Sequence, residues 1–184
     1  MKIWRLYCDV NKYLGYWVDN ESILEDIKNK LNTGEMISDW EAIQIEKGDE
    51  NSEIIGDISQ CWSYSGIIFV SEKVKTILEN IYSDELQFLE VFDEEDNKLY
   101  IMNILKYVEG IDYEKSKLHI VGGKYIVGVD EYVFPDIVKQ ISIFKLNLKG
   151  FRWNMAIFIS DDFKKLLQDN KVTGVLFEEL YEFN

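Results

Sequence analysis

Acidic side chains are the first candidates for chemistry in this sequence, because carboxylates act as metal ligands, as general acids and bases, and as charged contacts. Four of them form the unbroken run Asp93-Glu94-Glu95-Asp96. The twelve-residue ligand loop with its central glycine that binds Ca2+ is absent here. We therefore interpret the run as a solvated turn, and Asp93, Glu94, Glu95 and Asp96 are the candidate contacts for a basic partner.

Two serines, each followed by acids, are the next candidates. Ser71 and Ser160 both precede apolar residues at helical spacing, and no histidine lies near either in the sequence. A serine in this position accepts a hydrogen bond from an unpaired backbone N-H of the first helical turn, so both are predicted to be N-caps and not nucleophiles. Asp161 and Asp162 follow Ser160, but adjacent helical residues point about 100° apart, which suits neither a shared metal nor an acid/base pair.

The histidine and cysteine content favours no catalytic or metal site. His119 is the only histidine and lies in a strand-like segment, where a packed or edge-strand role is expected. Cys8 and Cys61 lack the paired spacing of a zinc site, and two cysteines are too few for a secreted disulfide scaffold. The sequence thus predicts no catalytic residue, no metal and no cofactor.

The two serines belong to a pattern that the chain contains twice. Residues 68–91 and 157–180 align without a gap at a constant offset of 89, with seven of 24 positions identical. Each copy reads as an aromatic pair, an apolar strand, a serine, a helix and a second strand. We therefore predict duplicated strand-helix-strand units at about 62–91 and 151–180. Neither unit can bury its apolar face alone, so they are expected to form one compact domain over 1–184.

The remaining elements follow from hydrophobic periodicity and turn residues. Ser22-x-x-Glu25 is a capping box that predicts a helix over 22–33. The acidic run joins two predicted strands in a hairpin, and Gly122-Gly123 predicts a second hairpin. The predicted strands are 3–10, 13–18 returning beside it, 40–45, 86–92, 99–105, 118–121, 125–129 and 141–148. The expected fold class is α+β, with mostly antiparallel sheets and about three helices.

Composition excludes several classes of protein. The chain has 184 residues, 47% of them hydrophobic, and a net charge of -14. Such a field repels nucleic acid and anionic lipid, so neither is an expected partner. No apolar run reaches eighteen residues and the start lacks a secretory pattern, so we expect a cytoplasmic protein. Acidic loops also keep proteins dissolved without any partner, and this explanation of the charge stays open.

Several short motifs in constant order resemble immunity family eleven of bacterial polymorphic toxin systems. The resemblance covers roughly 57–180 and leaves the first fifty residues less distinctive. It implies a small cytoplasmic antidote that binds the toxin encoded beside it, and it implies no catalytic residues. The matching residues are Asp57-Ile58, Ile68-Phe69-Val70-Ser71, Ile111-Asp112 with Ser116, Ile143-Phe144 with Leu146, Ile157-Phe158-Ile159-Ser160 with Phe163, Lys164 and Leu167, and Val172-Thr173-Gly174-Val175 with Phe177.

Three hypotheses of function follow. The first is a non-catalytic immunity protein that blocks the active site of a cognate toxin, with the acidic run speeding encounter with a basic enzyme. The second is a carboxylate- or metal-dependent hydrolase, which requires acids that converge in a cleft. The third is an acidic regulatory or scaffold protein with a constitutive partner. The sequence leaves the oligomeric state and the identity of the toxin open.

Overall fold

The computed structural model describes residues 1–48, 52–123 and 125–183. Within them the chain forms three α-helices, one 3-10 helix and fourteen strands, which confirms the predicted α+β class. In chain order the elements are β1 (Lys2–Cys8), β2 (Tyr16–Trp17), α1 (Glu21–Leu31), β3 (Ile43–Gln44), β4 (Glu46–Lys47), β5 (Ile58–Gln60), β6 (Ile68–Val70), α2 (Glu72–Leu78), β7 (Leu86–Phe92), β8 (Lys98–Ile104), β9 (Tyr107–Val108), β10 (Lys117–Val121), β11 (Tyr125–Glu131), η1 (Asp136–Gln140), β12 (Ile143–Leu148), β13 (Phe151–Ser160), α3 (Asp161–Asp169) and β14 (Val175–Glu182).

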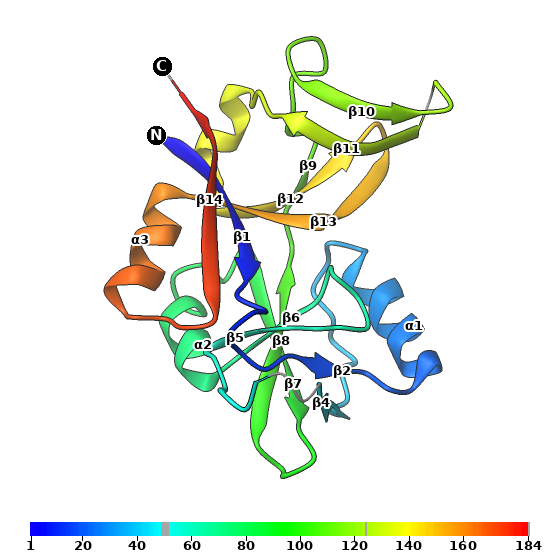
Figure 1. Ribbon diagram of the computed structural model, residues 1–184, viewed down its shortest axis with the longest axis vertical. Coiled ribbons are helices and arrows are strands. Elements are labelled where there is room, and N and C mark those ends of the chain that lie inside the picture. Colours follow the sequence, from blue (N-terminus) through cyan, green and yellow to red (C-terminus); the bar gives the residue numbers. More distant parts are fainter. Residues whose placement is uncertain (49–51, 124, 184) are drawn as a thin grey trace.

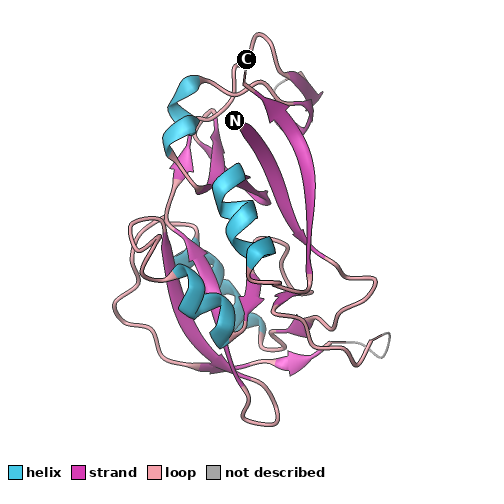
Figure 2. Ribbon diagram, turned by 90° about the vertical axis from the view of Figure 1, so that its left-hand side faces the viewer, coloured by secondary structure: helices cyan, strands magenta, loops and turns pink. Residues whose placement is uncertain are grey.

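Two mostly antiparallel sheets of five strands each build the molecule (Figure 1). The terminal sheet contains the first and last strands of the chain and has the order β14-β1-β13-β12-β9. The middle sheet has the order β3-β7-β8-β6-β5. Figure 2 shows the two sheets following one another along the long axis of the molecule, with both chain ends at the outer end of the terminal sheet.

The two predicted strand-helix-strand units have the same connectivity. In the first, β6 leads through α2 to β7; in the second, β13 leads through α3 to β14. The two strands of each unit are separated by one antiparallel strand, which is β8 in the middle sheet and β1 in the terminal sheet. The chain continues into β8 directly from β7, whereas β1 comes from the N-terminus. The first strand of the chain therefore completes the last unit.

A contact between the helix and the inserted strand occurs in both units. In the middle sheet, Val70 lies opposite Tyr100 of β8. The Tyr100 hydroxyl donates a hydrogen bond to the carboxylate of Glu72, the first residue of α2. The ammonium group of Lys75, one turn along the helix, lies 4.9 Å from the centre of the Tyr100 ring. These contacts attach the start of α2 to β8.

The terminal sheet has the corresponding contacts, and the residues of α3 that make them are numbered 89 higher than their counterparts in α2. Trp4 of β1 lies opposite Ile159, and its indole N-H donates to the carboxylate of Asp161, the first residue of α3, over 2.7 Å. The ammonium group of Lys164 lies 3.0 Å from the centre of the Trp4 ring. A lysine two residues before each aromatic residue also pairs with a glutamate of the neighbouring strand, Lys98 with Glu90 at 2.7 Å and Lys2 with Glu179 at 2.8 Å. The likeness of the two units therefore extends beyond the sequence match to the strands that fill them.

A single apolar cluster joins the two units. It contains Val74 and Leu78 of α2, Phe163 and Leu167 of α3, and side chains of both sheets, all buried. Two further clusters fill the opposite faces of the sheets, one beneath α1 and one beneath β10, β11 and η1. Because the first of these clusters contains side chains of both units, we infer that the units fold as one domain.

The local predictions for helix starts and hairpins are largely confirmed. The Ser71 hydroxyl accepts from Val74 N at 3.4 Å and the Ser160 hydroxyl accepts from Phe163 N at 3.3 Å, so both serines are N-caps. Strands β7 and β8 pair around the acidic run, and β10 pairs with β11. Gly122 and Gly123, between β10 and β11, have φ angles of 63° and 73°, which glycine adopts without strain.

Two local predictions are wrong. The N-cap of α1 is Asn20, whose side-chain oxygen accepts from the backbone N-H groups of Ser22 and Ile23, so the Ser22-Glu25 capping box does not form. Ser22 is already helical, because an equally good cap lies two residues earlier. The segment 13–18 was expected to return beside β1, but its strand β2 pairs with β4. The partner that β1 requires is supplied by β13 and β14, which only the complete chain brings together.

Candidate functional site

The acidic run forms the tip of the β7–β8 hairpin, and Asp93 builds this tip. Its carboxylate accepts hydrogen bonds from the backbone N-H groups of Glu95 and Asn97, both at 2.9 Å, and from the Asn97 side chain. Asp93 is 0% exposed. Burial alone would raise the pKa of this carboxyl, but the hydrogen bonds from Asn97 and Glu95 outweigh it and hold the pKa below its usual range. Of the four predicted contacts, Asp93 has no free surface for a partner.

The other three acids of the run are exposed. Glu95 forms an ion pair with Lys47 at 2.6 Å, and Glu94 accepts from the backbone N-H of the same lysine at 3.2 Å. Asp96 occupies the left-handed region with a φ of 61°, as the turn requires. The charge of the tip is therefore partly neutralised by the neighbouring strand β4. Binding of a partner by Glu94, Glu95 and Asp96 stays a prediction.

We expect Asp93→Ala to lower the free energy of unfolding by about 2 kcal/mol, because several hydrogen bonds to a buried carboxylate are lost. The triple variant Glu94→Gln, Glu95→Gln, Asp96→Asn is the matched control and should change stability by less than about 0.5 kcal/mol, since exposed ion pairs contribute little. Urea unfolding at pH 7 measures both. Because the pKa of Asp93 is lowered, its contribution is present at neutral pH and is lost as the pH falls through that pKa. Equal stability of Asp93→Ala and wild type would contradict this role.

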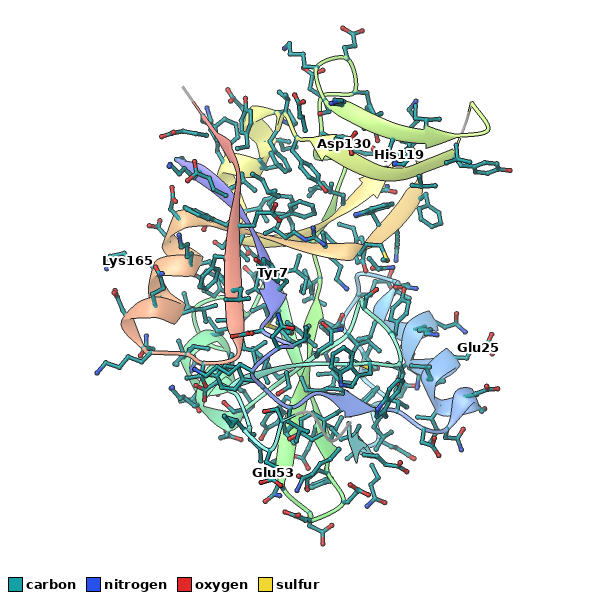
Figure 3. All side chains as sticks on the ribbon, in the orientation of Figure 1. Tyr7, Glu25, Glu53, His119, Asp130 and Lys165 are labelled. Atoms are coloured by element: carbon teal, nitrogen blue, oxygen red, sulfur yellow. The ribbon has the colours of Figure 1, made fainter. Side chains whose placement is uncertain are left out.

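The remaining candidates for chemistry have structural partners. Both oxygens of Asp161 are occupied, one by the Trp4 indole and one by the backbone N-H of Lys2 at 2.6 Å. Cys8 and Cys61 are free, buried thiols, and burial raises the pKa of Cys8 to about 12, which makes it a poor nucleophile at neutral pH. His119 lies exposed on β10 (Figure 3). Within the described residues, no three His, Cys, Asp or Glu side chains converge as metal ligands.

Asp57, ahead of β5, connects the two units. Its carboxylate accepts from the Ser71 hydroxyl at 3.1 Å, from the Lys73 ammonium group at 2.8 Å and from the backbone N-H of Thr173 at 2.9 Å. Gly174, which follows Thr173, has a φ of 81° and lies directly against the backbone of Ile58. Asp57, Thr173 and Gly174 all belong to the motifs noted in the sequence, and their contacts here are those of a structural junction.

A second surface feature was not predicted from the sequence. Phe151, Tyr125 and Met155 are 67%, 60% and 56% exposed, and two hollows lie beside them. Arg152 and Lys149 lie beside them. Phe151 begins β13, and Figure 1 shows the turn between β12 and β13 far from the β7–β8 hairpin that carries the acidic tip. The only sequence signal for this surface is that 141–160 contains three cations and no acid in a chain of net charge -14.

The comparison with known families identifies the class. The model of the immunity protein family Imm11 matches residues 42–182, well over half of the chain. The protein therefore belongs to this immunity protein family. No curated protein shows significant sequence similarity to the chain. Within the described residues, none of the helices combines the length and apolar character that crossing a membrane requires.

Proposed function

We propose that this protein is the antidote of a bacterial polymorphic toxin system, and that it neutralises one cognate toxin by binding it and blocking its active site. The observation that carries this proposal is the family match over 42–182. The protein acts without catalysis of its own, in the cytoplasm of the cell that makes the toxin. The toxin enzyme is inactive while the complex lasts, so a slow dissociation rate is the property on which protection depends.

The fold supports a binding role because a packed framework carries exposed hairpin ends and loops. The two capped units, the shared apolar cluster and the Asp57 junction form a rigid framework. Hairpin ends and loops project from this framework at both ends of the molecule (Figure 1). Loops on a stable framework tolerate changes of sequence, and this is how one family meets different partners.

The test is co-expression of the chain with the toxin domain encoded beside it. We expect the toxin to lose its ability to arrest growth, and the two proteins to purify as a stable complex. A catalytically inactive toxin variant provides the binding partner for measurements in solution. Undiminished toxicity together with no complex would contradict the proposal. Turnover of a substrate by the purified chain alone, abolished by neutralising one acid, would support the hydrolase alternative instead.

A further inference from the structure

Phe151 is the most exposed large apolar side chain among the described residues, and it is held in place. It opens β13, directly after a tight turn in which Lys149 and Gly150 have φ angles of 51° and 82°. The backbone N-H of Lys149 donates to the Tyr113 hydroxyl at 2.8 Å. Glu109 accepts from that hydroxyl at 2.9 Å and from Gly150 N at 3.3 Å. An aromatic side chain on an anchored turn loses little conformational entropy on binding.

Two hollows flank Phe151. The first has a volume of about 300 Å³ and lies between Phe151, Tyr125 and Lys149. The second has a volume of about 260 Å³ and lies between Phe151, Tyr64 and Met155, with Arg152 in its wall. The shared phenyl ring is therefore a ridge between two recesses. A partner side chain can enter on each side of it, which is the arrangement of a central binding anchor.

The cations of this surface have no carboxylate partner among the described residues. Lys149, Arg152 and Lys28 form no ion pair within the described part of the chain, whereas eleven other lysine or arginine side chains do. Each lies over a tyrosine ring instead. Lys149 is 5.2 Å from Tyr113, Arg152 is 5.0 Å from Tyr107, and Lys28 is 4.8 Å from Tyr64. The indole N-H of Trp153, which lines the second hollow, is buried without an acceptor in the structure.

Aromatic residues, methionine and arginine are the types enriched in protein–protein interfaces. We propose that the toxin docks on the surface formed by Tyr64, Tyr125, Lys149, Phe151, Arg152 and Met155, which we call the aromatic face, and that the docking surface of the toxin is apolar with carboxylates at its edge. This inference rests on the proposed function and specifies where and by what chemistry the toxin is held. Carboxylates of the toxin supply the anions that Lys149, Arg152 and Lys28 lack.

Charge also argues against a second copy of the chain as the occupant. A symmetric dimer through the aromatic face would bring Lys149 and Arg152 of both copies into one interface, and like charges gathered at an interface are unfavourable. The acidic tip, at the turn between β7 and β8, lies far from the turn between β12 and β13 in Figure 1, so a toxin surface of standard size that covers the aromatic face does not also reach the tip.

The experiment measures affinity for the inactive toxin domain by calorimetry or by surface binding kinetics. We expect Phe151→Ala to weaken binding at least about 30-fold, as for a central aromatic anchor, and Arg152→Glu at least about 10-fold. Ile137→Ala, which is 64% exposed on η1, is the matched apolar control. Lys165→Glu is the charge control, because Lys165 lies on α3, on the opposite side of Figure 1 from the turn between β12 and β13. Both controls and the triple variant of the acidic tip should bind within about threefold of wild type.

The outcomes separate the two proposals. If the wild-type chain does not bind the toxin, the proposed function fails. If it binds and Phe151→Ala, Arg152→Glu and Lys149→Glu all bind equally well, the toxin is held elsewhere and the aromatic face is excluded. A wild-type dimer that Phe151→Ala converts to monomers, with toxin binding intact, also overturns the inference. Thermal unfolding of each variant, expected to match wild type because these side chains are exposed, excludes misfolding as the cause.

Discussion

Gly174→Ala is expected to lower the free energy of unfolding by more than about 4 kcal/mol, a loss confined to a few mechanisms such as severe steric conflict. A methyl group at this position would lie 2.0 Å from the carbonyl oxygen of Ile58 and about 3 Å from two further backbone atoms of that residue. Backbone cannot rotate away as the end of a side chain can. Relief therefore requires the β14 unit to move away from β5, which breaks the hydrogen bond between Ile58 N and Thr173 O at 3.0 Å.

The chain provides a control that differs only in the surrounding space. Gly150 has a φ of 82°, nearly that of Gly174, but a methyl group there meets no atom within 4 Å. Gly150→Ala should therefore carry only the conformational cost of a positive φ, about 1–2 kcal/mol. Urea unfolding followed by tryptophan fluorescence measures both variants. Similar losses in the two would show that backbone strain, and not the contact with Ile58, is what requires glycine at 174.

The features that were predictable from the sequence are those set by neighbouring residues. The caps Ser71 and Ser160, the hairpin around the acidic run and the hairpin at Gly122-Gly123 each depend on a few adjacent side chains. The duplicated helical segments were visible because they recur at a fixed offset. The start of α1 also depends on neighbouring residues, but the prediction placed its N-cap at the wrong one. Asn20 and Ser22 are both good N-caps, and the sequence pattern does not show which of them is used.

The features that were not predictable depend on contacts between distant residues. Nothing local to Trp4 indicates that it lies against Asp161, or that β1 fills the unit that closes the chain. The aromatic face was not predictable for the same reason, because Tyr64, Tyr125 and Phe151 come from three separate segments of the chain. For the acidic run, exposure was predicted from composition, but the burial of Asp93 follows from turn geometry that composition does not encode.

Lys145 presents the second large expected effect, because its ammonium group is buried and no described residue provides a counterion. The side chain is 3% exposed and makes one described hydrogen bond, to the carbonyl oxygen of Gly66 at 2.9 Å. It forms no ion pair within the described residues. Burial lowers the pKa of Lys145 to about 8. At pH 7 the group is therefore charged in both states, and the folded protein bears the cost of an ammonium group removed from water.

The sign of the pH dependence follows from this lowered pKa. Between pH 8 and the ordinary lysine value of 10.5, the unfolded chain binds a proton at Lys145 that the folded chain has released, so the contribution of Lys145 to stability rises with pH across that window. The full difference corresponds to about 3 kcal/mol. Lys145→Met keeps the length of the side chain and removes the charge. After about 1 kcal/mol is subtracted for the lost hydrogen bond, the variant should be more stable than wild type by about 2 kcal/mol at pH 7.

Comparison of the two proteins across pH isolates Lys145 from other groups. The thiol of Cys8, with its pKa raised to about 12, costs stability as the pH rises above the usual value of 9, but it does so equally in both proteins. The advantage of Lys145→Met should therefore shrink steadily from pH 8 to pH 10, while Ile137→Ala, at an exposed side chain without a titratable group, shows no such trend. An advantage of Lys145→Met that stays constant with pH would show that the buried charge is not its cause. A loss of stability at pH 7 would mean that the hydrogen bond to Gly66 outweighs the cost of the buried charge. In that case Lys145 stabilises the packing of β12 against the loop that carries Tyr64.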